Sequence, residues 1–289
     1  MSKLKGHPRT RAPRAAASAW MTVAFLGALV SQAFAGQFRQ PGPGWPRDVF
    51  LWTDTCNVYV VRHGDAALLI DLGDGSVLDH LAEIGVRRVE WVLFTHHHRE
   101  QNQGYPRLAG TGARIAGPEA ERALFERPGD FRKMRVRLGD AFTVHGASYV
   151  RPPIQPIPLD RSFKAMDTFR WHNRDFRCVD TRGNSPGSMT YLCEDGGRWL
   201  AFSGDLMLAG ARMHTWFDTE WDYGFASGVW AIHNSAAQVA GYAPLWLLPS
   251  HGTPVREPKA QLAEYQAKLQ RLERLLVRGY DVQIGRAHV

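Results

Sequence analysis

Three consecutive histidines, His96–His98, come directly after the apolar run Trp91–Thr95, which predicts a buried strand. A single histidine is most often an ordinary core or surface residue, but three at the end of a strand indicate a site. Other residues that can bind metal follow this run or the ends of later predicted strands: Glu100, Gln101, Asn184, Asp205 and His251. Imidazole and carboxylate groups are common ligands of divalent ions. The sequence therefore predicts a fold in which several strand ends meet at one metal site.

Strands and helices alternate along the chain. Runs rich in β-branched and apolar residues predict strands over 57–62, 66–71, 91–95, 114–116, 168–171, 176–181, 189–193, 199–203 and 245–248. Helical patterns cover 76–84, 102–109, 118–125, 228–240 and 259–278. The Pro-rich segment 150–158 predicts a loop or linker. This alternation predicts the α/β fold class.

The composition excludes several classes of protein and partner. A chain of 289 residues with 44% hydrophobic and 11% aromatic residues can bury a large core, which excludes disorder and coiled coils. The formal net charge of +7 would favour a nucleic-acid or membrane partner. Five of the 35 basic residues lie in 1–35, which hold no Asp or Glu, so 30 basic face 28 acidic residues in the rest. We therefore expect a small-molecule substrate and no nucleic acid, and the oligomeric state stays open.

Residues 1–35 have the pattern of a secretory signal peptide. A basic segment precedes the apolar run 20–30, and the small residues Ala33 and Ala35 precede Gly36, as at a cleavage site. The apolar run is too short to cross a bilayer, so no stable membrane span is expected in the mature chain. An uncleaved membrane anchor is the alternative. We expect cleavage after Ala35, a domain over 36–283 and a periplasmic or secreted location.

The last six residues, 284–289 (IGRAHV), resemble the translation of a sequencing adapter. They are therefore expected to lie outside the domain, and the natural chain is expected to continue beyond Gln283. If so, His288 is not a metal ligand.

The three cysteines, Cys56, Cys178 and Cys193, are too few for a disulfide framework and lack zinc-ribbon spacing. Cys178 and Cys193 are equidistant from the centre of the loop between two predicted strands, so an antiparallel hairpin would place them face to face. Two buried thiols that behave as small hydrophobic residues are the alternative.

Five segments resemble, in the same order, the motifs of the metallo-β-lactamase fold superfamily. They are LLIDLG at 68–73, THHHREQ at 95–101, TRGNSPGS at 181–188, FSGDLM at 202–207 and PSHG at 249–252. Together they span roughly residues 50–255. The resemblance implies a four-layer αββα metallo-β-lactamase-like sandwich.

Position by position, the resemblance also implies a set of metal ligands. His96, His98 and Asn184 would bind a first ion. Glu100, Gln101 and His251 would bind a second, and Asp205 would bridge the two. Asp71, at the end of its strand, would support the ligands from behind.

Three of these positions depart from the superfamily pattern: Glu100 replaces Asp, Gln101 replaces His and Asn184 replaces His. Amide oxygens are weak ligands that suit harder ions better than zinc. The resemblance implies one or two divalent metal ions, zinc before manganese or iron. Glu100 and Asp205 keep two negative charges in the site, and we predict that both are catalytic.

Three more residues lie close to these motifs along the chain. His214 follows Asp205 closely enough to be a replacement ligand or a substrate contact, and a packed surface loop is the alternative. His97 and Arg99 alternate with the predicted ligands, so their side chains are expected to point away from the metal.

The resemblance implies a metal-dependent hydrolase in which an activated water attacks an ester, thioester, lactone, amide or phosphoester. A true β-lactamase would keep more of the histidines. A mono-iron oxygenase is a second possibility, since that group uses a His, His, Asp arrangement in this fold. The third is a non-catalytic binding or structural module whose altered site holds one ion weakly or none.

Overall fold

The computed structural model describes residues 36–132, 151–215 and 227–286. The predicted signal peptide, 1–35, lies outside these residues, as do the last three residues of the predicted tail. Helix α7 (Lys259–Arg286) runs through the first three residues of that tail. Among the described residues, no helix is both long and apolar enough to cross a bilayer.

The first sheet contains six strands in sequence order. They are β1 (Val49–Thr53), β2 (Asn57–His63), β3 (Ala66–Ile70), β4 (Arg88–Leu93), β5 (Arg114–Pro118) and β6 (Arg161–Phe163). The first three strands pair antiparallel, and the pairs from β3 to β6 are parallel. The parallel strands therefore end at one edge of the sheet, and His96–His98 follow β4 at that edge.

The second sheet also has six strands, in the order β12-β11-β10-β9-β8-β7. They are β7 (Thr168–Trp171), β8 (Arg174–Asp180), β9 (Met189–Asp195), β10 (Arg198–Gly204), β11 (Trp246–Pro249) and β12 (Val255–Arg256). The pair β10–β11 is parallel, so Asp205 and His251 follow neighbouring strand ends.

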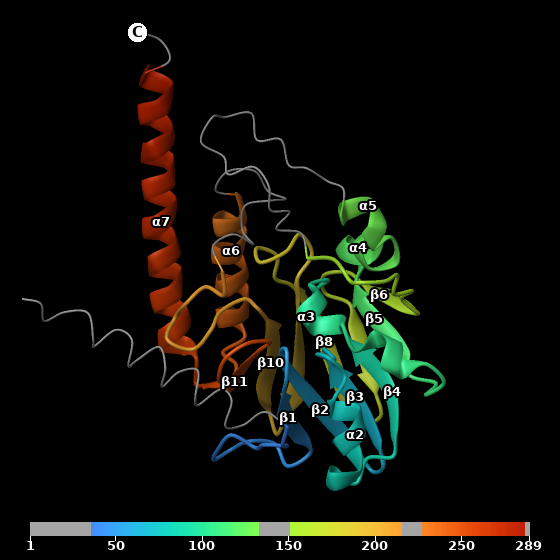
Figure 1. Cartoon of the computed structure of the whole chain (residues 1–289). Helices are drawn as coiled ribbons and strands as arrows, with labels where there is room; N and C mark the ends of the chain where they lie inside the picture. The colour runs from blue at the N-terminus through green and yellow to red at the C-terminus, as the bar shows by residue number, and fades with distance from the viewer. Residues whose placement is uncertain (1–35, 133–150, 216–226, 287–289) are drawn as a thin grey trace, which may run out of the picture. The chain divides into compact units, whose positions relative to one another are not determined.

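Helices cover the outer face of each sheet (Figure 1). Short helical segments lie in the first half of the chain: α2 (Val77–His80), η1 (Leu81–Ile84), α3 (Arg99–Asn102), η2 (Tyr105–Leu108), η3 (Glu119–Glu121), α4 (Arg122–Glu126) and α5 (Pro128–Arg132). The longer helices α6 (Ser227–Gly241) and α7 belong to the second half and pack against each other.

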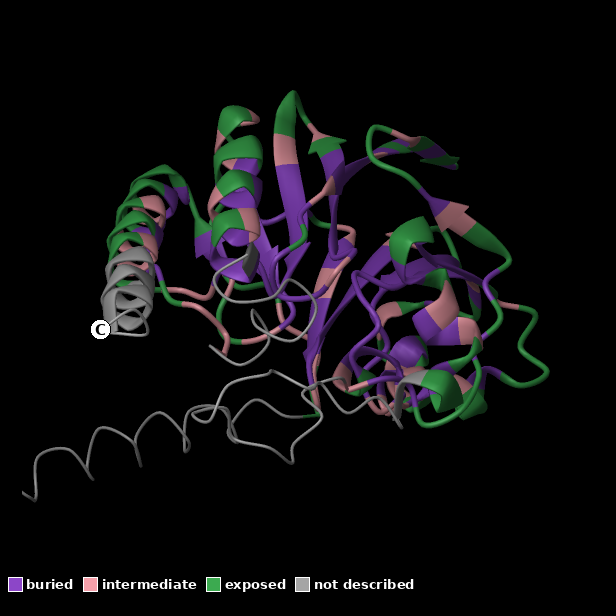
Figure 2. Cartoon of the chain, turned by 90° about the horizontal axis from the view of Figure 1, so that it is seen from above, coloured by how far each residue is buried: buried purple, intermediate pink, exposed green. Residues whose placement is uncertain are grey.

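Three hydrophobic clusters define four layers. One cluster joins residues of both sheets, including Tyr59 and Phe202, and forms the interior between them. A second cluster packs outer residues of the first sheet, such as Val60, against the short helical segments. The third packs the outer face of the second sheet against α6 and α7. Buried positions alternate with exposed ones along α6 and along residues 259–275 of α7 (Figure 2), and the αββα prediction is confirmed.

The predicted helix over 102–109 is wrong as a single element. Two short segments, α3 and η2, replace it. Pro106 has no N–H to continue a helix, and the amide of Gly104 instead donates to Gly73 O at 2.8 Å. This contact fixes the loop that carries the three histidines against the end of β3.

The cysteine pairing is not observed, and all three thiols are free and buried. In the β8–β9 pair, Cys178 lies opposite Tyr191, while Cys193 lies opposite Phe176. The actual turn is centred one residue earlier than the symmetric position between the cysteines, because Asp180 pairs with Met189. The register of the hairpin therefore differs from the predicted one by two residues.

Candidate metal centre

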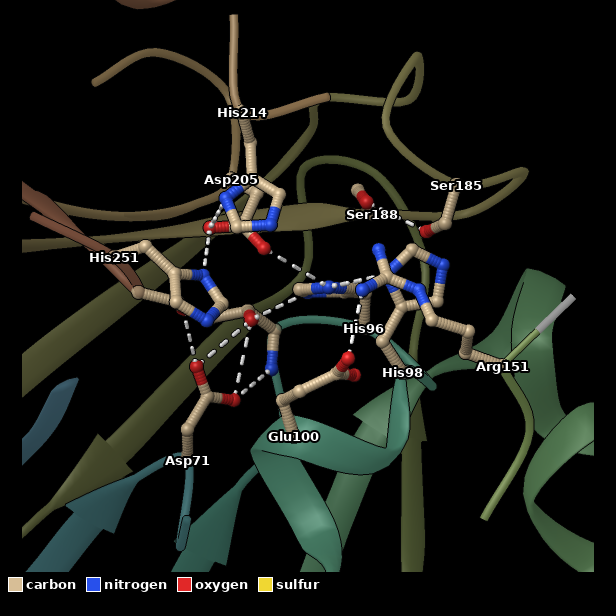
Figure 3. Close-up of polar contacts among 12 residues, drawn as sticks. Asp71, His96, His98, Glu100, Arg151, Ser185, Ser188, Asp205, His214 and His251 are labelled. Atoms are coloured by element: carbon tan, nitrogen blue, oxygen red, sulfur yellow. Dashed lines mark hydrogen bonds and ion pairs between the residues drawn. The ribbon is translucent and has the colours of Figure 1, made fainter. Parts of the chain in front are cut away.

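A first group of ligand atoms comes from two loops (Figure 3). His96 and His98 follow β4, and Asp205 follows β10; their ligand atoms all lie within 4.8 Å of one another. His96 Nε2 lies 3.1 Å from His98 Nδ1 and 3.5 Å from Asp205 Oδ2. All three side chains are buried. Two histidines and one carboxylate at this spacing can bind one divalent ion.

Hydrogen bonding behind His96 determines which nitrogen faces the group. Thr95 Oγ1 lies 2.9 Å from His96 Nδ1 and 2.9 Å from Asp71 Oδ2. With Asp71 ionised, the hydroxyl donates to the carboxylate and accepts from His96 Nδ1–H. The lone pair of His96 Nε2 then lies between His98 Nδ1, at 3.1 Å, and Asp205 Oδ2, at 3.5 Å, and Asp205 Oδ2 has no hydrogen-bond partner among the described residues. Two facing electron pairs are favourable only when a cation or proton lies between them.

The pKa values of these groups follow from burial and charge. Burial lowers the pKa of His96 to about 4, so its imidazole is neutral and available as a ligand at neutral pH. Burial acts against ionisation of Asp205, but the charge of His251 and its hydrogen bond hold the pKa of that carboxyl well below its usual range. A charged carboxylate and neutral imidazole are the forms that bind metal.

A second group shares Asp205 and adds His214 and His251, again with all ligand atoms within 4.8 Å. Asp205 Oδ1 lies 2.7 Å from His251 Nδ1 and 3.9 Å from His214 Nδ1. The two rings are 4.2 Å apart between centroids. The structure therefore brings His214 to the site, where the sequence left its role open.

Asp71 supports the loops without belonging to either group. Its carboxylate accepts from the Thr95 backbone N–H at 2.8 Å and from Ser250 Oγ at 2.6 Å. Asp71 has a positive φ of 58°, an uncommon conformation for a residue other than glycine. Burial raises the pKa of Asp71 to about 7. This residue joins the loop after β4 to the loop after β11.

Gly204 allows the Asp205 loop to approach this network closely. Its φ is +56°, and a Cβ atom there would lie 3.1 Å from Thr95 Oγ1. Glycine is the residue that accepts both the left-handed conformation and the close contact.

Glu100 lies beside the first group, but its carboxylate belongs to neither set of ligand atoms. Arg151 Nη1 lies 2.7 Å from Glu100 Oε1, and Arg151 Nη2 lies 3.4 Å from His98 Nδ1. Glu100 Oε2 has no hydrogen-bond partner among the described residues. No pattern along the chain pointed to Arg151, which lies in the Pro-rich segment predicted as a loop or linker.

The two amides occupy buried positions. Gln101 is fully buried, and neither amide atom of its side chain has a hydrogen-bond partner within the described part of the chain. Its backbone carbonyl accepts from Leu72 and Gly73. Asn184 is 2% exposed, and its Nδ2 is also without a partner there. Their roles as metal ligands remain predictions.

Glu121 is a site residue that the sequence analysis missed. Its carboxylate accepts from His97 N at 2.6 Å and Gly187 N at 2.9 Å, and it also accepts from Ser185 Oγ. His97 Nδ1 lies 3.0 Å from the same carboxylate, so the His97 side chain points to Glu121. The Arg99 side chain is exposed. Burial opposes ionisation of Glu121, but His97 and these hydrogen bonds lower its pKa to about 2. Its position just after β5, at the same sheet edge, is the signal that could have identified it.

The residues present fit a divalent metal. Several buried polar atoms around the two groups have no hydrogen-bond partner among the described residues: His98 Nε2, Glu100 Oε2, Asp205 Oδ2 and His214 Nδ1. Unpaired polar atoms in a protein interior are costly unless an ion or water satisfies them. The nitrogen and carboxylate donors are the type preferred by zinc and similar ions.

Comparison with known proteins gives a family and a fold. A model of the metallo-beta-lactamase superfamily matches residues 51–251. A metallo-beta-lactamase from Cronobacter sakazakii described by a HARLDQ motif has a TM-score of 0.60 and 18% identity, with 86% of this chain and 98% of that chain covered. Residues 96–101 here read HHHREQ, so both six-residue motifs begin with His and end with Gln.

Two sequence relatives carry the name hydroxyacylglutathione hydrolase. The protein from Acidiphilium cryptum is 39% identical over 138 residues, which are 47% of this chain and 44% of the relative. The protein from Albidiferax ferrireducens is 26% identical over 165 residues, or 56% of this chain and 49% of the relative. The chain thus spans about half the length of the curated relatives it matches.

Proposed function

The chain belongs to the metallo-beta-lactamase superfamily, and from this premise we propose that it is a metal-dependent hydrolase of ester or thioester bonds in small molecules. The observation that carries the proposal is the group His96, His98 and Asp205, buried at the meeting point of two strand ends. The name of the two relatives supports a thioester substrate before an amide, lactone or phosphoester.

A divalent ion, when bound, supplies a water with a lowered pKa and polarises the carbonyl under attack. The chain's own residues position the reaction. His96 is oriented by Thr95, whose hydroxyl is held by Asp71. Glu100 Oε2, unpaired among the described residues while Arg151 holds the other oxygen, can accept a proton from the attacking water.

The test of this function is an assay panel on the full chain with added zinc, manganese or iron(II). We expect hydrolysis of thioester or ester substrates, loss of activity with a chelator, and recovery on adding metal. Inactivity across thioester, ester, lactone, phosphodiester and β-lactam substrates, with less than about a tenth of an equivalent of bound metal, would favour the non-catalytic module. Zinc is our first choice of ion.

A mono-iron oxygenase is a second candidate, because the first group has two histidines and one carboxylate, the ligand set of many non-haem iron oxygenases. Iron content and oxygen uptake distinguish the two candidates. Iron as the bound metal together with substrate-dependent oxygen uptake would replace the hydrolase proposal.

We also propose that residues 1–35 direct export and are removed after Ala35, so that the mature protein is periplasmic or secreted. The basic segment, short apolar run and small residues before Gly36 support this. Intact-mass measurement on a periplasmic fraction should give a chain beginning at Gly36. A mass that includes residues 1–35, recovered with membranes, would instead indicate an uncleaved anchor.

A further inference from the structure

The two oxygens of the Asp205 carboxylate face different groups. Oδ2 lies 3.5 Å from His96 Nε2, whereas Oδ1 lies 2.7 Å from His251 Nδ1 and 3.9 Å from His214 Nδ1. Ligand atoms of one zinc ion are roughly 3 to 4 Å apart when each bond is about 2 Å. The Asp205–His214 separation fits this range, and a bound ion would take the place of the Asp205–His251 hydrogen bond. One carboxylate can therefore serve both groups.

His251 is oriented as a metal ligand usually is. Its Nε2 lies 3.2 Å from the carbonyl oxygen of Thr55, which can only accept a hydrogen bond. Nε2 therefore keeps its proton when His251 binds an ion, and Nδ1, which is hydrogen-bonded to Asp205 Oδ1 at 2.7 Å, is the nitrogen left to bind the ion in place of its proton. Donation of the second ring nitrogen to a backbone carbonyl is the common support of a metal-binding histidine.

His214 completes this group. Its ring lies 4.2 Å from that of His251, and its side chain is 19% exposed. Nδ1 is buried and has no hydrogen-bond partner among the described residues. A buried imidazole nitrogen that has no hydrogen-bond partner and lies near a carboxylate can bind a cation through its lone pair.

One carboxylate oxygen of Glu100 is paired with Arg151. Arg151 Nη1 lies 2.7 Å from Glu100 Oε1, and both side chains are about three-quarters buried, with 23% and 26% exposed. A partly buried guanidinium–carboxylate pair neutralises the charge that would otherwise draw Glu100 to a second ion.

We propose that Asp205, His214 and His251 bind a second divalent transition-metal ion, and that Arg151 holds Glu100 outside its ligand set. The two imidazoles and one carboxylate make a donor set suited to zinc. This assigns to His214 the position that the family resemblance gave to Glu100 and Gln101. The inference rests on the proposed function only for the presence of a first ion at His96 and His98.

The test is a competition titration of the metal-free full chain with zinc against a chromophoric chelator. Wild-type protein should bind two equivalents. His214→Ala should bind one, with the affinity for the second ion reduced at least about 100-fold. Glu100→Gln should still bind two, each with an affinity within about threefold of wild type. His80→Ala, which removes a partly exposed histidine paired with Glu83, is the matched control and should bind two.

Two bound ions in His214→Ala, or the loss of one ion in Glu100→Gln, would overturn the assignment. A wild-type protein that binds one zinc ion would also overturn it and would leave the hydrolase proposal intact. Conversely, two bound ions without turnover on any substrate would refute the hydrolase and not the second site. Near-ultraviolet circular dichroism checks folding, and His214→Asn provides a second variant if the alanine variant fails to fold.

Discussion

The two ligand groups that share Asp205 differ in how the protein holds them. His96 and His98 are at most 1% exposed and sit on a loop whose backbone is bonded to Asp71 and Glu121. His214 and His251 are 19% and 22% exposed, and the contact that orients His251 is a backbone carbonyl. Supporting contacts of this kind fix a ligand before the ion arrives. The histidines of the first group are therefore buried and held by hydrogen bonds to their own loop, whereas those of the second group are partly exposed. We expect the first group to bind metal more tightly.

Replacing Asp205 should remove metal binding at both groups, because they share its carboxylate. We expect Asp205→Asn to bind less than about a tenth of an equivalent of zinc and to lose activity on the order of 1,000-fold. Elemental analysis and turnover measurements check this, and circular dichroism should show an intact fold. Full zinc content in this variant would contradict a shared carboxylate.

The variant Glu121→Gln measures how much the contacts that support the first group contribute to the free energy of unfolding. The pKa of Glu121 falls from an ordinary 4.5 to about 2 in the folded protein, so ionised Glu121 stabilises the fold above pH 4.5. That contribution, on the order of 3 kcal/mol, should decline as the pH falls from 4.5 toward 2. Urea unfolding of metal-free wild type and Glu121→Gln should show the difference at pH 7 and its decline in acid.

The control for this prediction is Glu126→Gln, which removes a carboxylate paired with Arg122 on the helix surface. A surface pair of this kind contributes little, so its variant should unfold within about 0.5 kcal/mol of wild type. Equal stability of wild type and Glu121→Gln at pH 7 would mean that the buried network does not stabilise the loop.

Asp71→Asn should weaken the first group selectively. The variant keeps the shape of the side chain but replaces one of the two oxygens near the Thr95 hydroxyl by an NH2 group, which disturbs the hydrogen bond that orients Thr95 and, through it, His96. We expect zinc affinity at the first group to fall about 10-fold to 100-fold, with the second group within about threefold. The exposed Asp79→Asn, beside Arg107, is the control. Equal weakening at both groups would show that Asp71 supports the whole site and not one side of it.

The smallest effect is expected at Asn184. If its side chain faces the first group, Asn184→His adds an imidazole there and should raise zinc affinity about 10-fold. The same titration measures it. Unchanged affinity would place Asn184 outside the ligand set.

The sequence predicted the long elements well, because their patterns are local. The strand at 168–171 has the predicted bounds, and α6 (Ser227–Gly241) extends the predicted 228–240 by one residue at each end. The short edge strands β6 and β12 were missed, since two or three residues carry too little pattern. Of the two alternatives for Cys178 and Cys193, the facing pair is wrong and the buried free thiols are confirmed, because the turn between β8 and β9 is not centred between the two cysteines.

The site was less predictable than the fold for a physical reason. His96, His98 and Asp205 belong to motifs at strand ends, which sequence order can indicate. The pairing of Arg151 with Glu100 and of His97 with Glu121 depends on loops that meet in three dimensions. No spacing along the chain encodes such contacts, so only the structure could assign partners to these charges.

Hydrogen bonds between the two halves of the chain determine when, during synthesis, the site can be completed. The Asn57 side chain donates to Pro249 O and Gly252 O, and Ser250 Oγ donates to Asp71. A ribosome makes the first sheet, with His96 and His98, well before it makes Asp205 and His251. The carboxylate is absent until Asp205 has left the exit tunnel, and the loop that closes the site is absent until residue 252 has left it. Both ligand groups can therefore bind metal only after residue 252 has emerged, and a chain that stops before β11 would lack His251 and the loop that carries it.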